Sequence, residues 1–232
     1  MRKLTVLIAT VLLALAGCGD EKKDTRDSGG GEETTGAAPV GPQKAPQASN
    51  GCQTVPKPAA KEDGGQKKPS AKLDPGTTYR LTVETSCGSF TIELDQKQSS
   101  NACASLVSLA RAKFFDGTTF HRIVPGFVIQ GGDPTGTGAG GPGYSTRDKV
   151  PAGASYTKGV VAMAKAGNEP AGTAGSQFYV VTGDDAGLES DYAIVGKVVE
   201  GEDVVDRIGE LGGPDEQPTQ PVVIKTVRVE EG

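Results

Sequence analysis

The stretch from Phe120 to Asp133 carries the residue types in this chain that are best suited to chemistry. It reads Phe-His-Arg-Ile-Val-Pro-Gly-Phe-Val-Ile-Gln-Gly-Gly-Asp, so the polar Arg122 and Gln130 flank the apolar Phe127. An arginine is always charged and donates hydrogen bonds in fixed directions. Apolar residues stand between these two hydrogen-bonding side chains. The stretch therefore combines a fixed hydrogen-bond donor with an apolar surface, and it is the most informative part of the sequence.

Other kinds of catalytic site lack their residues. The chain has a single histidine, His121, and no pair of cysteines has the spacing of zinc ligands. The glycines at 131–143 are not followed by the Gly-Lys-Ser/Thr of a phosphate-binding loop. If the strand alternates, His121 faces away from Arg122, and we interpret it as a buried, hydrogen-bonded structural residue. We therefore expect no metal and no cofactor, and a hydrolase is a remote alternative.

The charge of the chain argues against one class of partner. The formal net charge at pH 7 is -5. Binding to phosphates requires a basic face, so nucleic acid is not an expected partner. Nothing in the sequence indicates an oligomer, and we expect a monomer.

The elements that must position these residues follow from hydrophobic periodicity. Apolar and polar residues alternate over 79–84 and over 90–94, with a Cys87-Gly88 turn between them, which predicts a β-hairpin. Ser99 or Ser100 can then cap a helix that ends near Lys113. Its predicted inner face comprises Ala102, Cys103, Leu106, Leu109 and Ala110.

The rest of the folded region alternates short apolar runs with glycine-rich turns. This pattern is typical of a mostly antiparallel β-barrel. A second helix is predicted over 202–208 and a last strand over 222–229, beside the first strand. The other predicted strand segments are 120–124, 127–129, 159–164, 177–182 and 192–199.

The stretch 120–133 also resembles the signature of the cyclophilin family. The resemblance covers Tyr79 to about Val229 in the family's order. It implies a mainly β fold, a closed eight-stranded antiparallel β-barrel capped by two α-helices. It also implies a groove that binds proline-containing polypeptides and speeds cis/trans interconversion, whose barrier is about 18–20 kcal/mol. The further matching stretches are Gly140-Gly141-Pro142-Gly143-Tyr144, Val161-Ala162-Met163-Ala164, Gly175-Ser176-Gln177-Phe178-Tyr179 and Val195-Gly196-Lys197-Val198.

The resemblance assigns roles to individual residues. Arg122 matches the catalytic arginine, and Gln130 is expected to donate to the substrate carbonyl and to help orient Arg122. The backbone at Ala164 and Lys165 is expected to bind the residues that flank proline. Gln177 lines an adjoining pocket and Tyr192 also contacts substrate. The apolar wall of the proline slot is assigned to Phe127, Val128, Tyr179 and Leu188.

Three positions depart from the pattern of many eukaryotic members. Gly187 stands where they carry Trp, and Lys165 and Tyr192 stand where they carry Asn and His. We therefore expect weak inhibition by cyclosporin, which a titration would test. A binding module of the same fold, which holds proline-containing segments with only incidental catalysis, is the alternative to an enzyme.

The first third of the chain predicts export and anchoring. All eleven Tyr and Phe residues lie at or after Tyr79, so we expect one folded domain over 78–232. Residues 1–17 predict a signal peptide, and Leu15-Ala16-Gly17-Cys18 resembles the lipobox of bacterial lipoproteins, with Cys18 lipidated. The alternative is an ordinary signal cut after Gly17. Residues 18–77 predict a flexible linker, and the expected location is the extracytoplasmic face of the cell membrane, where exported proteins are the clients.

Three further cysteines follow Cys18. Cys87 lies in the hairpin turn and is expected to be exposed, whereas Cys103 is expected to face the core. We weakly prefer a disulfide between Cys52 and Cys87. Reduction of all three thiols is about equally compatible with the sequence.

Overall fold

A computed structural model of the chain describes residues 50–232. The predicted signal peptide (1–17), the lipidated Cys18 and the start of the linker lie outside the described residues. Within residues 50–232, no helix combines the length and the apolar character needed to cross a membrane.

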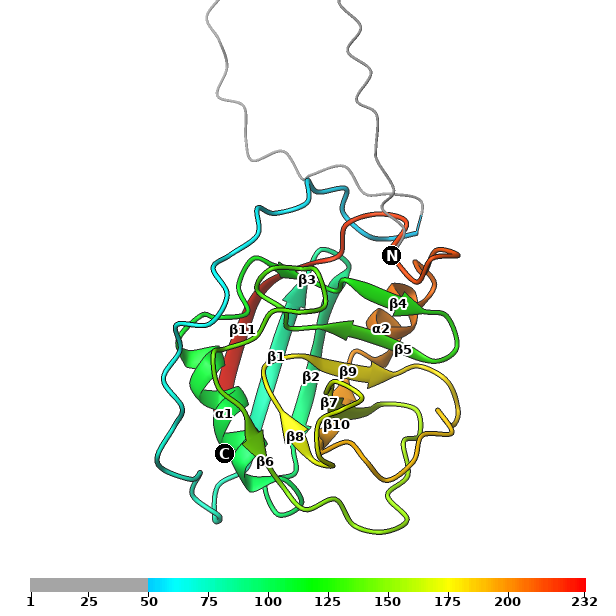
Figure 1. The fold of residues 1–232 in the computed structure, drawn as a ribbon. Coiled ribbons are helices and arrows are strands. Elements are labelled where there is room, and N and C mark those ends of the chain that lie inside the picture. The colour runs from blue at the N-terminus through cyan, green and yellow to red at the C-terminus, as the bar shows by residue number, and fades with distance from the viewer. Residues whose placement is uncertain (1–49) are drawn as a thin grey trace, which may run out of the picture. The chain divides into compact units, whose positions relative to one another are not determined.

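The described residues form two helices and eleven strands (Figure 1). The helices are α1 (Ser100–Arg111) and α2 (Glu202–Gly209), close to their predicted positions. The strands are β1 (Tyr79–Thr85), β2 (Gly88–Leu94), β3 (Thr118–Thr119), β4 (Arg122–Val124), β5 (Val128–Gly131), β6 (Thr146–Arg147), β7 (Val160–Met163), β8 (Thr173–Ala174), β9 (Phe178–Val181), β10 (Ile194–Glu200) and β11 (Val223–Glu231).

Nine of the strands form one antiparallel sheet. Their order is β3-β11-β1-β2-β10-β7-β9-β5-β4, and β6 pairs with β8 in a separate ribbon. The predicted hairpin of β1 and β2 is confirmed, with Val83 opposite Phe90. The first and last long strands are neighbours, since β1 pairs along its length with β11.

The prediction of a closed eight-stranded barrel is wrong. The sheet is a half-barrel whose edge strands in the described region are β3 and β4. β3 has two residues, which pair only with Val223 and Ile224 of β11. β4 has three residues and pairs only with β5. Edge strands this short form no ladder with each other, and between the two ends of the sheet there is a single isolated bridge, from Thr119 to Asp133.

One face of the sheet covers the main core. Ile123, Ile129, Val180 and Val161 lie opposite one another on four neighbouring strands and are at most 1% exposed. Phe120 and Phe178 pack edge to face, with ring centroids 6.1 Å apart. Because side chains alternate along a strand, the residues between these point to the opposite face.

The N-terminus of helix α1 is capped by a residue that is distant in the sequence. The predicted inner face of the helix is buried. Ser99 precedes the helix, but its side chain makes no capping hydrogen bond, contrary to expectation. Instead, the Asp148 carboxylate accepts from the backbone N–H groups of Asn101 and Ala102, at 3.0 and 2.8 Å. A carboxylate at this end also complements the helix dipole.

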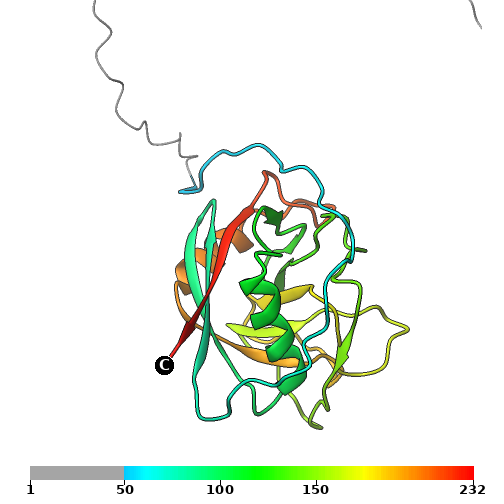
Figure 2. The ribbon, with the colours of Figure 1, turned by 90° about the vertical axis from the view of Figure 1, so that its left-hand side faces the viewer.

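Residues 50–77, here called the strap, lie against the domain, contrary to the predicted flexible linker. In Figures 1 and 2 this blue-to-cyan segment follows the outside of the domain and passes α1. The strap contains no helix or extended strand, but the domain satisfies many of its polar groups. For example, the Lys61 ammonium donates to the carbonyls of Phe114 and Asp116, at 2.6 and 3.1 Å, just beyond α1.

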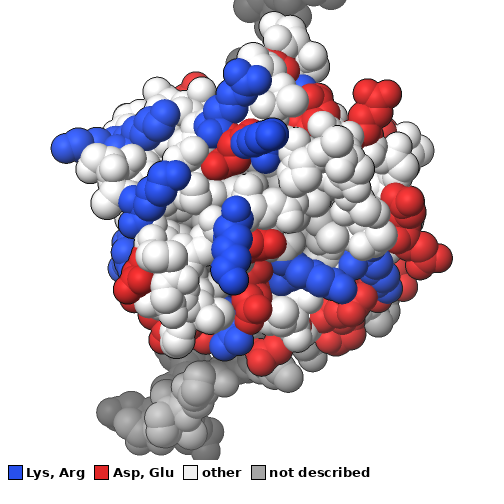
Figure 3. Space-filling model, turned by 90° about the horizontal axis from the view of Figure 1, so that it is seen from below, with Lys and Arg blue, Asp and Glu red and all other residues white. Residues whose placement is uncertain are grey.

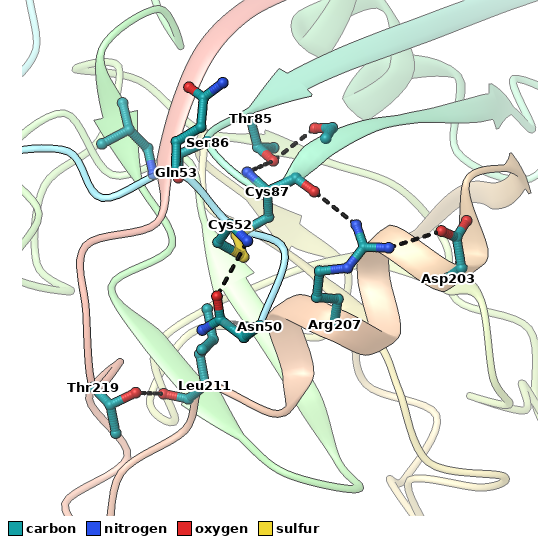
Figure 4. The surroundings of a disulfide bond; sticks show 12 residues. Asn50, Cys52, Gln53, Thr85, Ser86, Cys87, Asp203, Arg207, Leu211 and Thr219 are labelled. Carbon is teal, nitrogen blue, oxygen red and sulfur yellow. Dashed lines mark hydrogen bonds and ion pairs between the residues drawn. A yellow bond between two sulfur atoms is a disulfide. The ribbon is translucent and has the colours of Figure 1, made fainter. Parts of the chain in front are cut away.

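A disulfide joins the start of the strap to the β1–β2 turn (Figure 4). Cys52 is fully buried and Cys87 is 2% exposed, so the expected exposure of Cys87 is wrong, because the strap covers the turn. Arg207 of α2 donates to the Cys87 carbonyl at 2.8 Å. Cys103 is a buried free thiol, as predicted.

Candidate functional site

Four strands bring the chemically active side chains into one row. Arg122 on β4 lies opposite Gln130 on β5. Gln130 lies opposite Tyr179 on β9, and Tyr179 lies opposite Ala162 on β7. Directly opposed residues share a face, so this row lies on the face away from the main core.

A second apolar cluster covers this outer face. Tyr179 lies within it and packs edge to face on Tyr192, with ring centroids 5.7 Å apart. Burial raises the pKa of Tyr179, whose hydroxyl has no hydrogen-bond partner among the described residues. The four residues predicted to wall a proline slot all belong to or pack against the cluster. Its buried members are Val128, Tyr156, Ala162, Tyr179 and Val181, and Phe127, Ala164, Leu188 and Tyr192 are among the partly buried residues packed on it.

Arg122 stands at the edge of this cluster. Its guanidinium carbon lies 5.9 Å from the centre of the Phe127 ring, and its side chain is 34% exposed. Its Nε donates to a carboxylate oxygen of Glu216 at 2.6 Å. Within residues 50–232, its terminal N–H groups have no protein acceptor. One edge of the guanidinium is thus held, and the other is free to donate.

Sequence reasoning missed Glu216. It lies 94 positions from Arg122, in the turn between α2 and β11, and no spacing signal connects the two. Its backbone is in the left-handed region, with φ 63°, and its carbonyl accepts from the N–H of Ile123 at 2.7 Å. The hydrogen bond from Arg122 and the charge of that residue hold the pKa of Glu216 below its ordinary value.

Two glutamines link the row to a glycine-rich loop. Gln130 donates to the side-chain oxygen of Gln177 at 3.0 Å. Gln177 in turn donates to the carbonyls of Gly138 and Gly140, at 3.0 and 2.9 Å. Gln130 therefore contacts Gln177, whereas no hydrogen bond joins it to Arg122, which it was expected to orient.

Asp133 fixes the conformation of the same glycine-rich loop through hydrogen bonds to its backbone. Its fully buried carboxylate accepts from the backbone N–H groups of Thr135, Thr137 and Gly138, at 2.7, 3.0 and 2.6 Å. Burial alone would raise its pKa, but the hydrogen bonds from the Thr135 hydroxyl and from the backbone of Thr135 and Gly138 outweigh burial and lower it. The carboxylate is therefore charged at neutral pH and fixes the course of the loop.

The backbone at Ala164 and Lys165, predicted to bind the residues that flank proline, is partly occupied by contacts within the protein. The Lys165 side chain is only 3% exposed, and its ammonium pairs with Asp191 at 2.5 Å and lies 5.5 Å from the centre of the Tyr192 ring. The N–H of Ala164 donates to the Gln177 carbonyl at 2.9 Å and is not free for substrate. The Ala164 carbonyl and the Lys165 N–H have no protein partner among the described residues and can still face a peptide.

His121 takes no part in the row. Its two ring nitrogens are buried and have no hydrogen-bond partner within the described residues, so the expectation of a hydrogen-bonded histidine is wrong. Burial is the main cause that lowers its pKa, and a neutral ring tolerates this setting. The part of the chain that the structure describes contains no cluster of three or more metal-binding side chains.

Acidic and basic side chains are interspersed on the face of the molecule shown in Figure 3. No broad basic patch covers that face. This distribution offers no continuous attraction for a polyanion there.

Comparisons with known proteins give one consistent result. The family model described as cyclophilin type peptidyl-prolyl cis-trans isomerase matches residues 80–229. Peptidyl-prolyl cis-trans isomerase CYP18-2 of Arabidopsis thaliana is 38% identical over 140 residues, covering 59% of this chain and 84% of that protein. Peptidyl-prolyl cis-trans isomerase A of Mycobacterium tuberculosis is 36% identical over 179 residues, covering 69% of this chain and 97% of that protein.

Solved structures resemble the fold in the same way. A cyclophilin type peptidyl-prolyl cis-trans isomerase of Cryptosporidium parvum superposes with a TM-score of 0.62 at 28% identity, over 67% of this chain and 99% of that one. The structure of that protein in the presence of the dipeptide Ala-Pro gives a TM-score of 0.61 at 30% identity, over 66% of this chain and 99% of that one.

Proposed function

Because the chain belongs to the cyclophilin family and is a cyclophilin-type peptidyl-prolyl cis-trans isomerase, we propose that Arg122 is its catalytic residue. The proline ring of the substrate lies on the outer apolar cluster, and the guanidinium donates to the prolyl nitrogen. The observation that carries this proposal is the position of Arg122 beside Phe127, with Nε bound to Glu216 and the terminal N–H groups without an acceptor among residues 50–232.

The reaction needs only a change in bond order during rotation. Amide resonance makes the barrier about 18–20 kcal/mol, because it gives the C–N bond partial double-bond character. As the bond twists, the lone pair returns to nitrogen, which becomes a better hydrogen-bond acceptor. A donor held in advance binds this twisted state more tightly than either planar isomer, and the barrier falls.

The apolar wall makes the rotation selective for proline. Phe127, Tyr179 and Leu188 hold the pyrrolidine ring, while the carbonyl of the preceding residue swings toward Gln130. The Gln130 amide is set by Gln177 and donates to that carbonyl. Because one side of the bond is held still and the other is guided, the bound substrate lies close to the geometry of the transition state, and the barrier to rotation falls. The proline ring in the Ala-Pro dipeptide of the Cryptosporidium parvum crystals is a group of the size this slot would take.

Glu216 is the positioning residue for Arg122, and its removal should show this. In Glu216→Gln the charge is lost while an acceptor for Nε remains, and we expect kcat/KM to fall about two- to fivefold, the range for exposed ion pairs. Exchange NMR on an Ala-Pro peptide measures this rate.

A pH profile distinguishes positioning from a structural effect. The pKa of Glu216 is lowered, so the native ion pair persists at its ordinary pKa and above and is lost as the pH falls through the lowered value. The native protein should lose rate over that acidic window, and Glu216→Gln should not show this step. Asp215→Asn, one residue away and without contact to Arg122, is the matched control. Equal rates and equal profiles for all three proteins would refute the positioning role.

We also propose that the protein is a monomeric lipoprotein, anchored on the extracytoplasmic face of the membrane, which assists the folding of exported proteins. The lipobox-like sequence before Cys18 supports this proposal. Mass spectrometry of the mature protein should find an N-terminal Cys18 that carries acyl chains. An unmodified N-terminus at Cys18, or an uncut chain, would contradict it.

A further inference from the structure

A groove adjoins the row of site residues on the side of the two glutamines. Its volume is about 790 Å³, and it starts at Gln130 and Gln177. One wall is the loop 138–145, which Asp133 and Gln177 hold in place, and the other is the segment 164–166. A polypeptide whose proline occupies the apolar cluster would pass a neighbouring side chain into this groove.

The strap supplies one residue of the lining, Asp63. Asp63 lies outside the region 80–229 that matches the cyclophilin family. Its Oδ1 accepts from the N–H of Gly141 at 2.7 Å, whereas its Oδ2 has no hydrogen-bond donor among the described residues. Asp63 is exposed, so this second oxygen is available to a ligand.

The position of Asp63 is set by the backbone on both sides of it. The N–H of Lys61 donates to the Pro134 carbonyl at 2.9 Å, and the N–H of Gly64 donates to the Gly141 carbonyl at 2.9 Å. Gly143 approaches so closely that a Cβ on it would lie 3.0 Å from the Gly64 Cα. Two glycines allow this contact, which presses the strap onto the wall of the groove.

The charged groups around the groove leave it acidic. The lining contains the carboxylates of Asp63 and Glu169 and one cation, Lys165. The Lys165 ammonium is already paired with Asp191 and is turned away from solvent. Lys68 binds the Ser145 carbonyl at 2.8 Å at one end of the groove, but it is not part of the lining.

We propose that Asp63 is a specificity-determining residue, through which this groove prefers client segments with a lysine or arginine close to the X-Pro bond. The inference rests on the proposed function and adds a substrate class to it. A cationic side chain in the groove gains the attraction of Oδ2, and an acidic one is repelled.

The test compares peptides that differ only in charge beside the X-Pro bond. Ala-Pro peptides with Lys, Ala or Glu at the flanking positions on either side are assayed for kcat/KM with the native protein, Asp63→Asn and Glu62→Gln. Asparagine retains an acceptor for Gly141 and removes only the charge. Glu62 is exposed, precedes Asp63 and does not line the groove, so Glu62→Gln is the matched control.

The native protein should prefer Lys to Glu at one flanking position by about two- to fivefold, as expected for an exposed ion pair. The preference should disappear in Asp63→Asn, persist in Glu62→Gln and shrink at high salt, and the uncharged peptide should react equally with the native protein and Glu62→Gln. Equal Lys-to-Glu ratios in the native protein and Asp63→Asn, with activity intact, would overturn this inference alone. No isomerisation of any peptide by the native protein would overturn the proposed function as well.

Discussion

Arg122→Ala is expected to lower kcat/KM for an Ala-Pro peptide by about 10²- to 10³-fold, the usual effect of removing a donor that stabilises a transition state. The described residues offer no substitute for the guanidinium, since Gln130, the polar residue opposite Arg122, is uncharged and its amide is oriented by Gln177. A protease-coupled assay measures the rate. The fold should persist, because Arg122 is partly exposed and its ion pair lies at the surface.

Two controls separate a catalytic role of Arg122 from a role in folding or in peptide binding. Arg228→Ala removes an exposed arginine of β11 and should leave the rate unchanged. Peptide affinity, measured separately, should change little in Arg122→Ala, because the apolar cluster still holds the proline ring. If native protein and Arg122→Ala isomerise the peptide equally slowly, the chain is a binding module and the proposed catalytic role fails.

Loss of the Cys52–Cys87 disulfide is expected to lower the free energy of unfolding by about 4 kcal/mol, because the bond closes a loop with a sequence separation of 35. Both cysteines are replaced by alanine, because alanine places neither a buried hydroxyl nor a thiol at positions 52 and 87. Denaturant unfolding of the native protein, with and without a reductant, measures the difference in the free energy of unfolding.

The double variant is its own control for the reductant. The remaining described cysteine, Cys103, is already a free thiol, so the reductant should leave the unfolding of the double variant unchanged. A native protein whose unfolding midpoint does not respond to full reduction would contradict the predicted contribution. Slower proteolysis of the strap in the oxidised than in the reduced protein would be a further sign of the same constraint.

Local pattern predicts most of the elements and misses how the sheet ends. Alternation over 79–94 predicts β1 and β2, and helical spacing predicts α1 and α2, because each of these elements buries one face of its own. Closure of the barrel depends instead on whether β3 and β4 are long enough to meet. No periodicity can be read from strands of two and three residues.

The candidate site likewise has residues that the sequence predicts and residues that it does not. The stretch 120–133 predicts Arg122, Phe127 and Gln130, because the resemblance to a family lies in contiguous residues. Glu216 and Asp63 reach the site from turns and loops far along the chain, where ion pairs and backbone contacts leave no mark in local sequence. The strap is missed for a related reason. Its Pro- and Lys-rich composition is typical of a linker, but the domain supplies partners for its polar groups.

The most direct test of the account is a crystal structure of the native protein with a bound Ala-Pro peptide. We expect the proline ring to lie against Phe127 and Tyr179, with a terminal nitrogen of Arg122 within about 3.5 Å of the prolyl nitrogen, a hydrogen-bond distance. A peptide bound at the outer apolar cluster with Arg122 turned away from it, or a proline seated elsewhere on the domain, would contradict the account.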